Sequence, residues 1–302
     1  GYFVSIALLF VVLTPFGIES HGARRWFRIP GVPLQVQPAE IAKLCMILFL
    51  ASLVCKMGRS IRTGKGFMIM LLIPMPICGL IYGVTRNLSS AIIIFGIAVL
   101  MLFVSTPDYK RFVLLGLAGI AVCALVVFLI ANADSSDALG VRGTRILAWL
   151  DPEAYASGKG FQTLQALYAI GSGGILGKGL GQSMQKLGFL PEAQNDMIFS
   201  IICEELGLFG AISILIMFIL LIWRFMVIAN NAPDLFGALL VVGVLGHLAI
   251  QVILNVAVVT NTIPNTGISL PFISYGGSAV LFLLVEIGIV LSVGRGIRLR
   301  DL

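Results

Sequence analysis

Asp196 has the clearest potential for chemistry in this chain. It lies in the stretch LPEAQNDMIFSIICEELG, residues 190–207, where a polar loop meets an apolar segment long enough for a helix. Aspartate is a favoured N-cap, and the helix dipole would keep such a carboxylate ionised and weakly basic. The same carboxylate could act as a general base if a bound substrate excluded water and raised its pKa. The local sequence leaves both interpretations open.

Other ionisable residues in apolar segments have a simpler interpretation. Glu204 follows Asp196 after eight residues of predicted helix, about 12 Å, which is too far for two carboxylates to share a proton. Polar residues inside a membrane bundle usually pair with one another. We expect that role for Glu204, Glu205, His247, Gln251, Asn255 and Glu286. His247, Gln251 and Asn255 recur at i, i+4 and i+8 and therefore share one helix face.

A group of basic residues could bind an anion. Loop 20–38 contains three arginines, among them Arg25, and arginine forms bidentate hydrogen bonds with phosphate. Glu40 and Lys43 follow at i, i+3 near the start of the next predicted helix, so they share one face. The alternatives are lipid-headgroup anchoring for the arginines and a structural ion pair for Glu40 and Lys43. The sequence therefore predicts either a phosphate site or an anchoring surface.

The glycine-rich run GSGGILGKGLG, residues 171–181, does not match a nucleotide-binding motif. Ser172 occupies the first glycine position of the Walker pattern, and Gly179 occupies its Ser/Thr position. A dinucleotide-binding motif would need a preceding strand, which the sequence does not predict. Loop flexibility and backbone contact with a ligand or lipid both remain open for this run.

The composition indicates a membrane-embedded chain. Of its 302 residues, 59% are hydrophobic and 11% are charged, whereas a soluble domain has roughly 25% charged residues. Eight apolar segments approach the ~20 residues that cross a bilayer as a helix. They are residues 1–19, 39–57, 67–83, 88–105, 112–131, 197–222, 235–259 and 276–294. We therefore predict an all-α polytopic membrane protein, with residues 1–302 forming a single helical bundle.

Basic residues in the loops predict the orientation. Ten lysines and arginines lie at Lys56, in loops 58–66 and 106–111, in segment 223–234 and in the tail. The positive-inside rule makes these segments cytoplasmic. The long loop 132–195 then lies outside, and a loop of that length is usually functional. Within it, FQTLQALYAI, residues 161–170, predicts an amphipathic helix at the membrane face.

Two further expectations follow from the loops and the start of the chain. Loop 260–275 is too polar to span and is predicted to be a re-entrant loop or an outer cap, packed on protein in either case. The chain starts without Met inside an apolar segment, so we expect it to be truncated at the N-terminus or a fragment. The predicted orientation puts residue 1 on the inside, so the number of missing spans should be even if the true N-terminus is cytoplasmic.

Three long motifs resemble one family. They are RRW (24–26) with QPAEIAK (37–43), the stretch from Arg145 to Gly207, and PNTGISLPFISYGGS (264–278). Together they are similar to the SEDS family of shape, elongation, division and sporulation proteins, the FtsW/RodA/SpoVE group, over nearly the whole chain. Family members have ten spans, so the eight counted here imply that two are absent. Some positions depart from the family pattern: Ala39 replaces serine, Gln194-Asn195 replaces His-Thr, and RNLSSA (86–91) replaces PDLGT.

The resemblance implies a peptidoglycan glycosyltransferase in the bacterial cytoplasmic membrane. It would polymerise lipid II at the outer face during division, growth or sporulation, and the third motif looks closest to division or sporulation members. Its expected partners are lipid II, a class B penicillin-binding protein and other divisome, elongation or sporulation proteins, with no nucleic acid. The family's essential aspartate falls on Asp196, and its other motif residues fall on Arg25, Glu40 and Lys43.

The expected mechanism is displacement at an anomeric carbon with inversion. Asp196 would take the proton of the acceptor hydroxyl, and basic residues would balance the departing pyrophosphate. The candidates for substrate binding are Arg25, Glu40, Lys43, Arg142, Arg145 and Lys178. Mg²⁺ or Mn²⁺ is a candidate to share this charge balance, and no organic cofactor is expected. The alternatives are a flippase for the lipid-linked precursor and a non-catalytic scaffold for a penicillin-binding protein.

Overall fold

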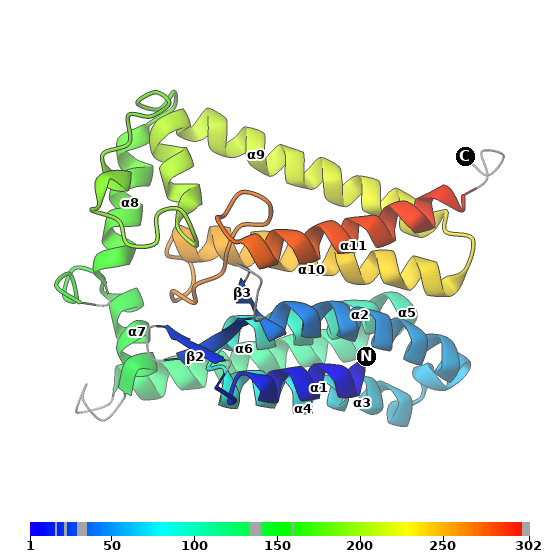
Figure 1. Cartoon of the computed structure of the whole chain (residues 1–302). Helices are drawn as coiled ribbons and strands as arrows, with labels where there is room; N and C mark the ends of the chain where they lie inside the picture. The colour runs from blue at the N-terminus through cyan, green and yellow to red at the C-terminus, as the bar shows by residue number, and fades with distance from the viewer. Residues whose placement is uncertain (16, 21–22, 29–34, 133–139, 159, 298–302) are drawn as a thin grey trace. The chain divides into compact units, whose positions relative to one another are not determined.

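The structure, a computed structural model, is dominated by long helices (Figure 1). It describes the chain except for residues 16, 21–22, 29–34, 133–139, 159 and 298–302. In the described part, seven helical segments are long and apolar enough to cross a membrane. They are α2 (Pro38–Met57) with the short 3₁₀ helix η1 (Gly58–Arg62), α3 (Gly64–Leu72) with α4 (Pro74–Val84), α5 (Leu88–Ser105), α6 (Tyr109–Ala131), α9 (Ile198–Asn230), α10 (Leu235–Val259) and α11 (Gly277–Arg295). These match seven of the eight predicted spans and confirm the polytopic helical bundle.

The first predicted span, residues 1–19, is wrong. Helix α1 (Tyr2–Val11) has ten residues, and the chain then turns and enters a strand at Gly17. Pro15 explains the early end, because proline has no N–H to donate and disfavours helical backbone at the preceding residue.

A small antiparallel sheet follows, which the all-α prediction missed. Its order is β1 (Gly17–Ser20), β2 (Ala23–Arg28) and β3 (Gln35–Val36). The three strands are short, and β3 has only two residues. No alternation of polar and apolar residues is therefore long enough to predict them from the sequence.

The chain divides into two compact units. Unit one comprises residues 1–108, 219–251 and 276–302, and unit two comprises residues 109–218 and 252–275. Each is described by itself below.

Unit one is held together by close packing of apolar helices. The buried side chains of α2 include Met46, Ile47 and Leu50, which are fully inaccessible to solvent. Glycines allow α10 to approach its neighbours: Gly243 lies against the Ile47 side chain, and Gly246 lies against Leu100 of α5. Small residues at helix contacts are typical of membrane bundles, where close packing replaces the hydrophobic effect between helices.

Unit two contains the long loop and its two helices, α7 (Gly140–Leu150) and α8 (Phe161–Gly173), and a short 3₁₀ helix, η3 (Gln185–Leu187). Helix α8 confirms the helix predicted at 161–170, whereas α7 was not predicted. Loop 260–275 is irregular, and Ile268 and Leu270 within it are buried. This confirms that the loop is packed on protein.

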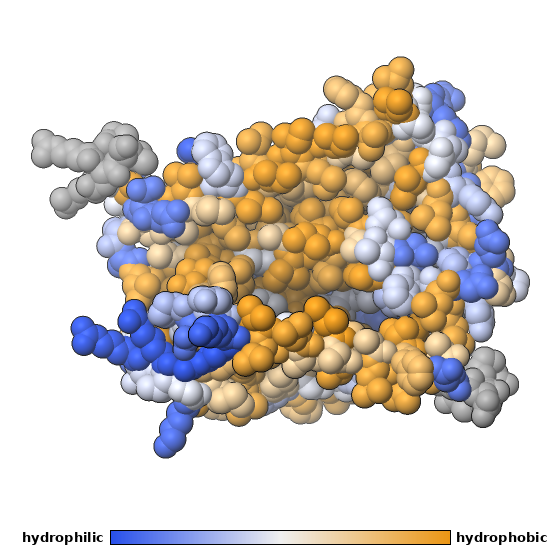
Figure 2. All heavy atoms as spheres, turned by 180° about the vertical axis from the view of Figure 1, so that it is seen from behind, coloured by the Kyte–Doolittle hydropathy of each residue, from blue (hydrophilic) through white to orange (hydrophobic). Residues whose placement is uncertain are grey.

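The outward faces of the long helices are apolar. Much of the surface in Figure 2 is formed by hydrophobic side chains. Large hydrophobic residues are exposed along α6 and α9, and α6 has no buried residue among those described. Such surfaces are stable where lipid replaces water.

Candidate active site

Asp196 lies two residues before α9 in a loop that is fixed by backbone-directed hydrogen bonds. The side-chain amide of Asn255 donates to the carbonyl of Asp196 at 2.8 Å and to that of Ile268 at 2.6 Å. The hydroxyl of Ser274 donates to the carbonyl of Asn195 at 2.6 Å. The loop before α9 is therefore tied to α10 and to loop 260–275, all within unit two.

The carboxyl group of Asp196 is left open for a ligand. Its Oδ1 is buried and has no hydrogen-bond partner in the described part of the chain. Gly267 lies beside the other oxygen, so that a Cβ at this position would lie 3.5 Å from Oδ2. Gly267 also has a φ of 66°, which glycine adopts without strain. A side chain at Gly267 would therefore narrow the space in front of the carboxyl.

Burial changes the acid strength of Asp196. Burial and, to a smaller extent, the negative charge of Glu192 raise the pKa of Asp196 to about 7, while a backbone hydrogen bond and Arg145 oppose the shift. Of the two interpretations left open by the sequence, this raised pKa favours the general base over the ionised helix cap, because desolvation outweighs the helix end. A carboxyl group with this pKa is suited to accept a proton at neutral pH.

Helix α7 places a cation near Asp196 and an aromatic ring against loop 260–275. Arg145 is the nearby positive charge that lowers the pKa of Asp196. One turn later, the indole N–H of Trp149 donates to the carbonyl of Asn261 at 2.9 Å, which ties α7 to loop 260–275. Arg142 also belongs to α7, but its side chain is outside the described part of the structure.

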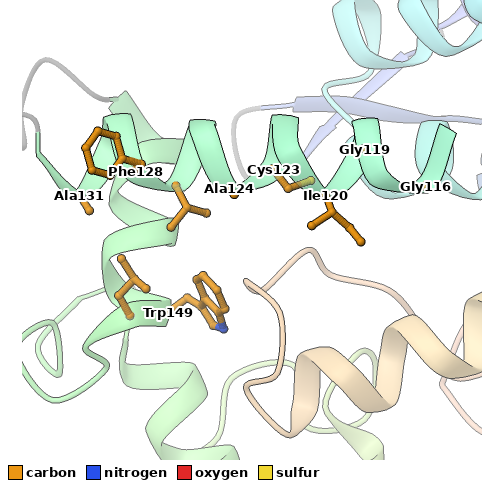
Figure 3. A pocket seen from close by; sticks show the side chains of 10 residues that line it. Gly116, Gly119, Ile120, Cys123, Ala124, Phe128, Ala131 and Trp149 are labelled. Carbon is orange, nitrogen blue, oxygen red and sulfur yellow. The ribbon is translucent and has the colours of Figure 1, made fainter. Parts of the chain in front are cut away.

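An apolar pocket adjoins α7 (Figure 3). Its volume is about 880 Å³, and one face of α6 lines it, with Trp149 opposite. Leu150 of α7 also lines it. The α6 side is formed by small and apolar residues, among them Gly116, Gly119 and Ile120. Arg145 and Trp149 are at i, i+4 and so lie on one face of α7. Unit two therefore combines a cation with an apolar pocket, as a ligand with an anionic head and an apolar chain requires, and it also holds the acid Asp196.

Lys178 is engaged by a carboxylate. Its Nζ lies 2.7 Å from Oε1 of Glu204, and the Ser183 hydroxyl donates to Oε2 at 2.5 Å. Glu205 pairs with Lys186 at 2.5 Å. These contacts confirm that Glu204 and Glu205 have polar partners, although the partners come from the loop. The role of Lys178 as a substrate ligand stays a prediction.

The remaining predicted site residues belong to unit one. Lys43 Nζ lies 2.8 Å from Oε2 of Glu40, and both side chains are buried. Arg25, on β2, donates to the carbonyl of Arg86 at 3.5 Å. The pairing of Glu40 with Lys43 confirms the shared helix face, and their role in binding a substrate stays a prediction.

Two residues near Lys43 were not assigned to the site by sequence. Nε2 of His247 lies 2.9 Å from Nζ of Lys43, and Nδ1 of the same ring lies 2.8 Å from Oε2 of Glu286. The available signals were the polar stripe on 235–259 and the lone acid in 276–294. The sequence does not show that helix packing brings His247 to Lys43 and Glu286 to His247.

The comparisons with known proteins agree with these features. Residues 1–298 match the FtsW/RodA/SpoVE family, described as cell cycle protein. The chain belongs to this family. It is 41% identical over 296 residues to Stage V sporulation protein E of Bacillus subtilis (strain 168), covering 95% of this chain and 76% of that protein. It is 39% identical over 302 residues to a probable peptidoglycan glycosyltransferase FtsW of Trichlorobacter lovleyi, covering 99% and 76%.

Solved structures of the FtsW/RodA/SpoVE type share the fold. The crystal structure of Thermus thermophilus rod shape determining protein RodA has a TM-score of 0.63 and 29% identity, covering 97% of this chain and 76% of that one. A chain from a peptidoglycan synthase complex, studied for the coordination of polymerization and crosslinking, has a TM-score of 0.78 and 30% identity, covering 97% and 79%. The family predicted from the motifs is thus confirmed, as is the multi-pass membrane location.

Proposed function

We propose that this chain is a peptidoglycan glycosyltransferase that polymerises lipid II at the outer face of the cytoplasmic membrane. The observation that carries this proposal is Asp196, which combines a pKa of about 7 with a buried oxygen that has no partner among the described residues. Membership of the FtsW/RodA/SpoVE family supports it, because relatives in that family are named as probable peptidoglycan glycosyltransferases.

Asp196 is the general base of the reaction. It accepts the proton of the acceptor sugar's hydroxyl while that oxygen bonds to the anomeric carbon of the donor. The bond from this carbon to the pyrophosphate breaks, and the pyrophosphate leaves with the electron pair. The configuration inverts, because the acceptor attacks from the face opposite the leaving group. Arg145 offsets the negative charge near the base and is available to the departing anion.

The apolar pocket between α6 and α7 suits the lipid part of the substrate. A volume of about 880 Å³ with glycine, alanine and isoleucine on its α6 side accommodates a segment of an isoprenoid chain. Trp149, which lines this pocket, lies one helical turn after Arg145. Holding lipid-linked donor and acceptor in one membrane plane supplies the proximity that a bimolecular sugar transfer needs.

The other site residues and a metal ion are assigned supporting roles. Arg25 and Lys43, the latter paired with Glu40, stay candidates for contact with the substrate. Arg142 and Lys178 are further candidates for substrate contact. No group of three metal-ligating side chains occurs among the described residues. Mg²⁺ is nevertheless commonly held largely by substrate phosphates, with few protein ligands, so it stays a candidate beside the pyrophosphate. Such an ion would supply charge neutralisation at the pyrophosphate.

We also propose a class B penicillin-binding protein as the partner. The support is the structural similarity to a chain of a peptidoglycan synthase complex. A strand made by this chain would then be cross-linked in the same assembly.

The test is lipid II polymerisation by the purified chain with its partner in detergent micelles. Micelles have no second leaflet, so a flippase gives no product there, whereas a polymerase produces glycan strands. A reaction that contains the partner without this chain tests the alternative that this chain is only a scaffold. Strands formed only when this chain is present support the proposal, and strands formed equally by the partner alone overturn it.

A further inference from the structure

Gln162 of α8 bonds to two loop segments that approach each other at Asp196. Its side-chain Nε2 donates to the carbonyl of Pro191 at 3.3 Å, in the loop that leads to Asp196. Its Oε1 accepts a hydrogen bond from the side-chain amide of Asn265 at 2.9 Å, in loop 260–275. All of these residues belong to unit two. We call the two side chains of Gln162 and Asn265 the amide clamp.

The Asn265 side of the amide clamp leads to the carboxyl group of Asp196. Oδ1 of Asn265 accepts from the backbone N–H of Gly267 at 3.1 Å and closes a turn. Gly267 is the residue whose Cβ position lies 3.5 Å from Oδ2 of Asp196. The carbonyl of the next residue, Ile268, accepts from Asn255 of α10 at 2.6 Å. Gly267 is therefore held on one side by a bond to α8 and on the other by a bond to α10.

A glutamine side chain suits the position between the two segments. One planar amide carries both a donor and an acceptor, and here each meets a group of the opposite kind. The reversed amide would place carbonyl against carbonyl and N–H against N–H, so a single orientation satisfies both bonds. Gln162 therefore fixes the spacing between the two loop segments, and not the place of one segment alone.

The amide clamp brings no charge to the site. The charged groups that act on Asp196 are Glu192, from its own loop, and Arg145, from α7. No Asp, Glu, Lys, Arg or His occurs in three of the segments around it: α8, loop 260–275 and residues 252–259 of α10. The tyrosines of α8 and of the loop, Tyr168 and Tyr275, are more than half exposed. Uncharged substitutions in the clamp therefore leave the charges around Asp196 in the protein and change the access of water.

We propose that Gln162 and Asn265 are positioning residues that hold loop 260–275 closed against Asp196 during sugar transfer, an inference that rests on the proposed function. A closed loop excludes water from the carboxylate, and a poorly hydrated carboxylate is a stronger base for the acceptor hydroxyl. Gly267 has no side chain to anchor it, so its place depends on the bonds of its neighbours. Without the clamp, the loop loses its side-chain bond to α8 beside the base.

Melting curves test the amide clamp without using activity. The melting temperature Tm is measured at pH 8 for each protein and for the same protein carrying D196N. The gain in Tm from D196N reports the cost of ionising the buried carboxyl. Q162L and N265S should reduce this gain to about half or less, because water then reaches the carboxylate and lowers that cost. N265S keeps a hydroxyl acceptor for the N–H of Gly267 and removes the amide that bonds to Gln162.

The matched control is Q165L. Gln165 is on the same helix and is partly exposed, as Gln162 is. It takes part in neither bond of Gln162. Q165L should therefore leave the gain from D196N unchanged.

Polymerisation kinetics then test the positioning role. The midpoint of the pH profile of kcat/KM should fall by about one pH unit in Q162L and in N265S. At pH 8, where the base is ionised, kcat should fall about tenfold, because a hydrated carboxylate is a weaker base. Q165L should match the unmodified protein in both respects. A merely structural role of the clamp would lower Tm and leave the midpoint in place.

A reduced gain from D196N together with a lowered midpoint supports the amide clamp and its positioning role. A gain that Q162L and N265S leave at full size, or no gain in the unmodified protein, overturns the clamp whether or not the chain polymerises lipid II. A reduced gain with an unmoved midpoint overturns the positioning role. If N265S does not fold, Q162L decides alone. If the unmodified protein forms no glycan strands while the gain is reduced, the proposed function fails and the positioning role falls with it.

Discussion

Asp196 is poised between its protonated and ionised forms near neutral pH. Burial is the main cause of its pKa of about 7, and the nearby charge of Glu192 adds to it. Arg145 acts in the opposite direction. The acid strength of this residue therefore depends on burial and on two charged neighbours in unit two, and each neighbour can be changed by itself.

The pH dependence of the rate should report this pKa. We expect kcat/KM to rise about tenfold per pH unit below pH 7 and to level off above it, because the base must be ionised in the free enzyme. Replacing Glu192 by glutamine removes a negative charge that raises the pKa of Asp196, so the midpoint should move to lower pH. A rate that is flat from pH 5 to 9, or a midpoint that E192Q leaves in place, would contradict Asp196 as the base.

The raised pKa of Asp196 should also make the thermal stability of the protein depend on pH. The folded pKa of about 7 lies above the value of about 3.9 for an unfolded chain, so the folded protein holds the proton more tightly. Stability is then lost as the pH rises from about 4 through 7. We expect D196N to melt at a higher temperature than the unmodified protein at pH 8, with the difference vanishing near pH 4. A D196N protein that melts lower at pH 8 would show that the carboxylate is stabilised instead.

At the scale of elements, the glycine-rich run supports a break in α9. Gly207 interrupts the helix with a φ of 66° and a ψ of −166°. Four backbone N–H groups bond across the break at 2.9 to 3.2 Å: Lys178 to Glu204, Gly179 to Glu205, Leu208 to Gly174 and Phe209 to Ile175. These bonds replace helical bonds that the break removes. The run is therefore neither a free linker nor a nucleotide loop.

Replacing Gly207 by alanine should weaken this contact. A Cβ there would collide with the backbone of Gly177 and Ile175, and the positive φ is itself unfavourable for alanine. We expect G207A to lower the free energy of unfolding by about 1–3 kcal/mol, measured as a fall in Tm. G288A in α11 is the matched control, because a Cβ there meets nothing within 4 Å. Equal Tm values for the two variants would contradict the role of the break.

Elements differed in how well the sequence predicted them. The seven long apolar segments were predicted because bilayer length requires such runs. Helix α7 was missed because its eleven residues include two glycines and two arginines and resemble a polar loop. For the glycine-rich run 171–181, the sequence left loop flexibility and ligand contact as alternatives, because residue spacing cannot show which backbone a glycine approaches.

At the scale of the whole molecule, the orientation predicted from basic loops is open to direct test. Single cysteines are placed in a variant without the five native ones, and intact cells are treated with an impermeant maleimide. L187C lies in the long loop at an exposed position and should be labelled. R59C lies in a basic loop and should be labelled only after the membrane is permeabilised. The reverse pattern would place Asp196 on the cytoplasmic side and exclude chemistry at the outer face.

The candidate site was predicted from sequence only in part. Asp196 was identified from its place before an apolar helix and from family motifs. In the structure, its Oδ1 has no hydrogen-bond partner among the described residues. Its raised pKa depends on burial by segments distant in sequence, including loop 260–275, and no local pattern encodes that. The contact of Lys43 with His247 likewise joins residues 204 positions apart.

The most direct test of the account is lipid II polymerisation by the unmodified chain and by D196N, each purified with its partner. Retained partner binding and a Tm at pH 8 no lower than that of the unmodified protein establish that D196N is folded. We predict glycan strands from the unmodified chain and a rate at least about a hundredfold lower from D196N, because the general base is lost. Strand formation by folded D196N at the full rate would contradict the central claim.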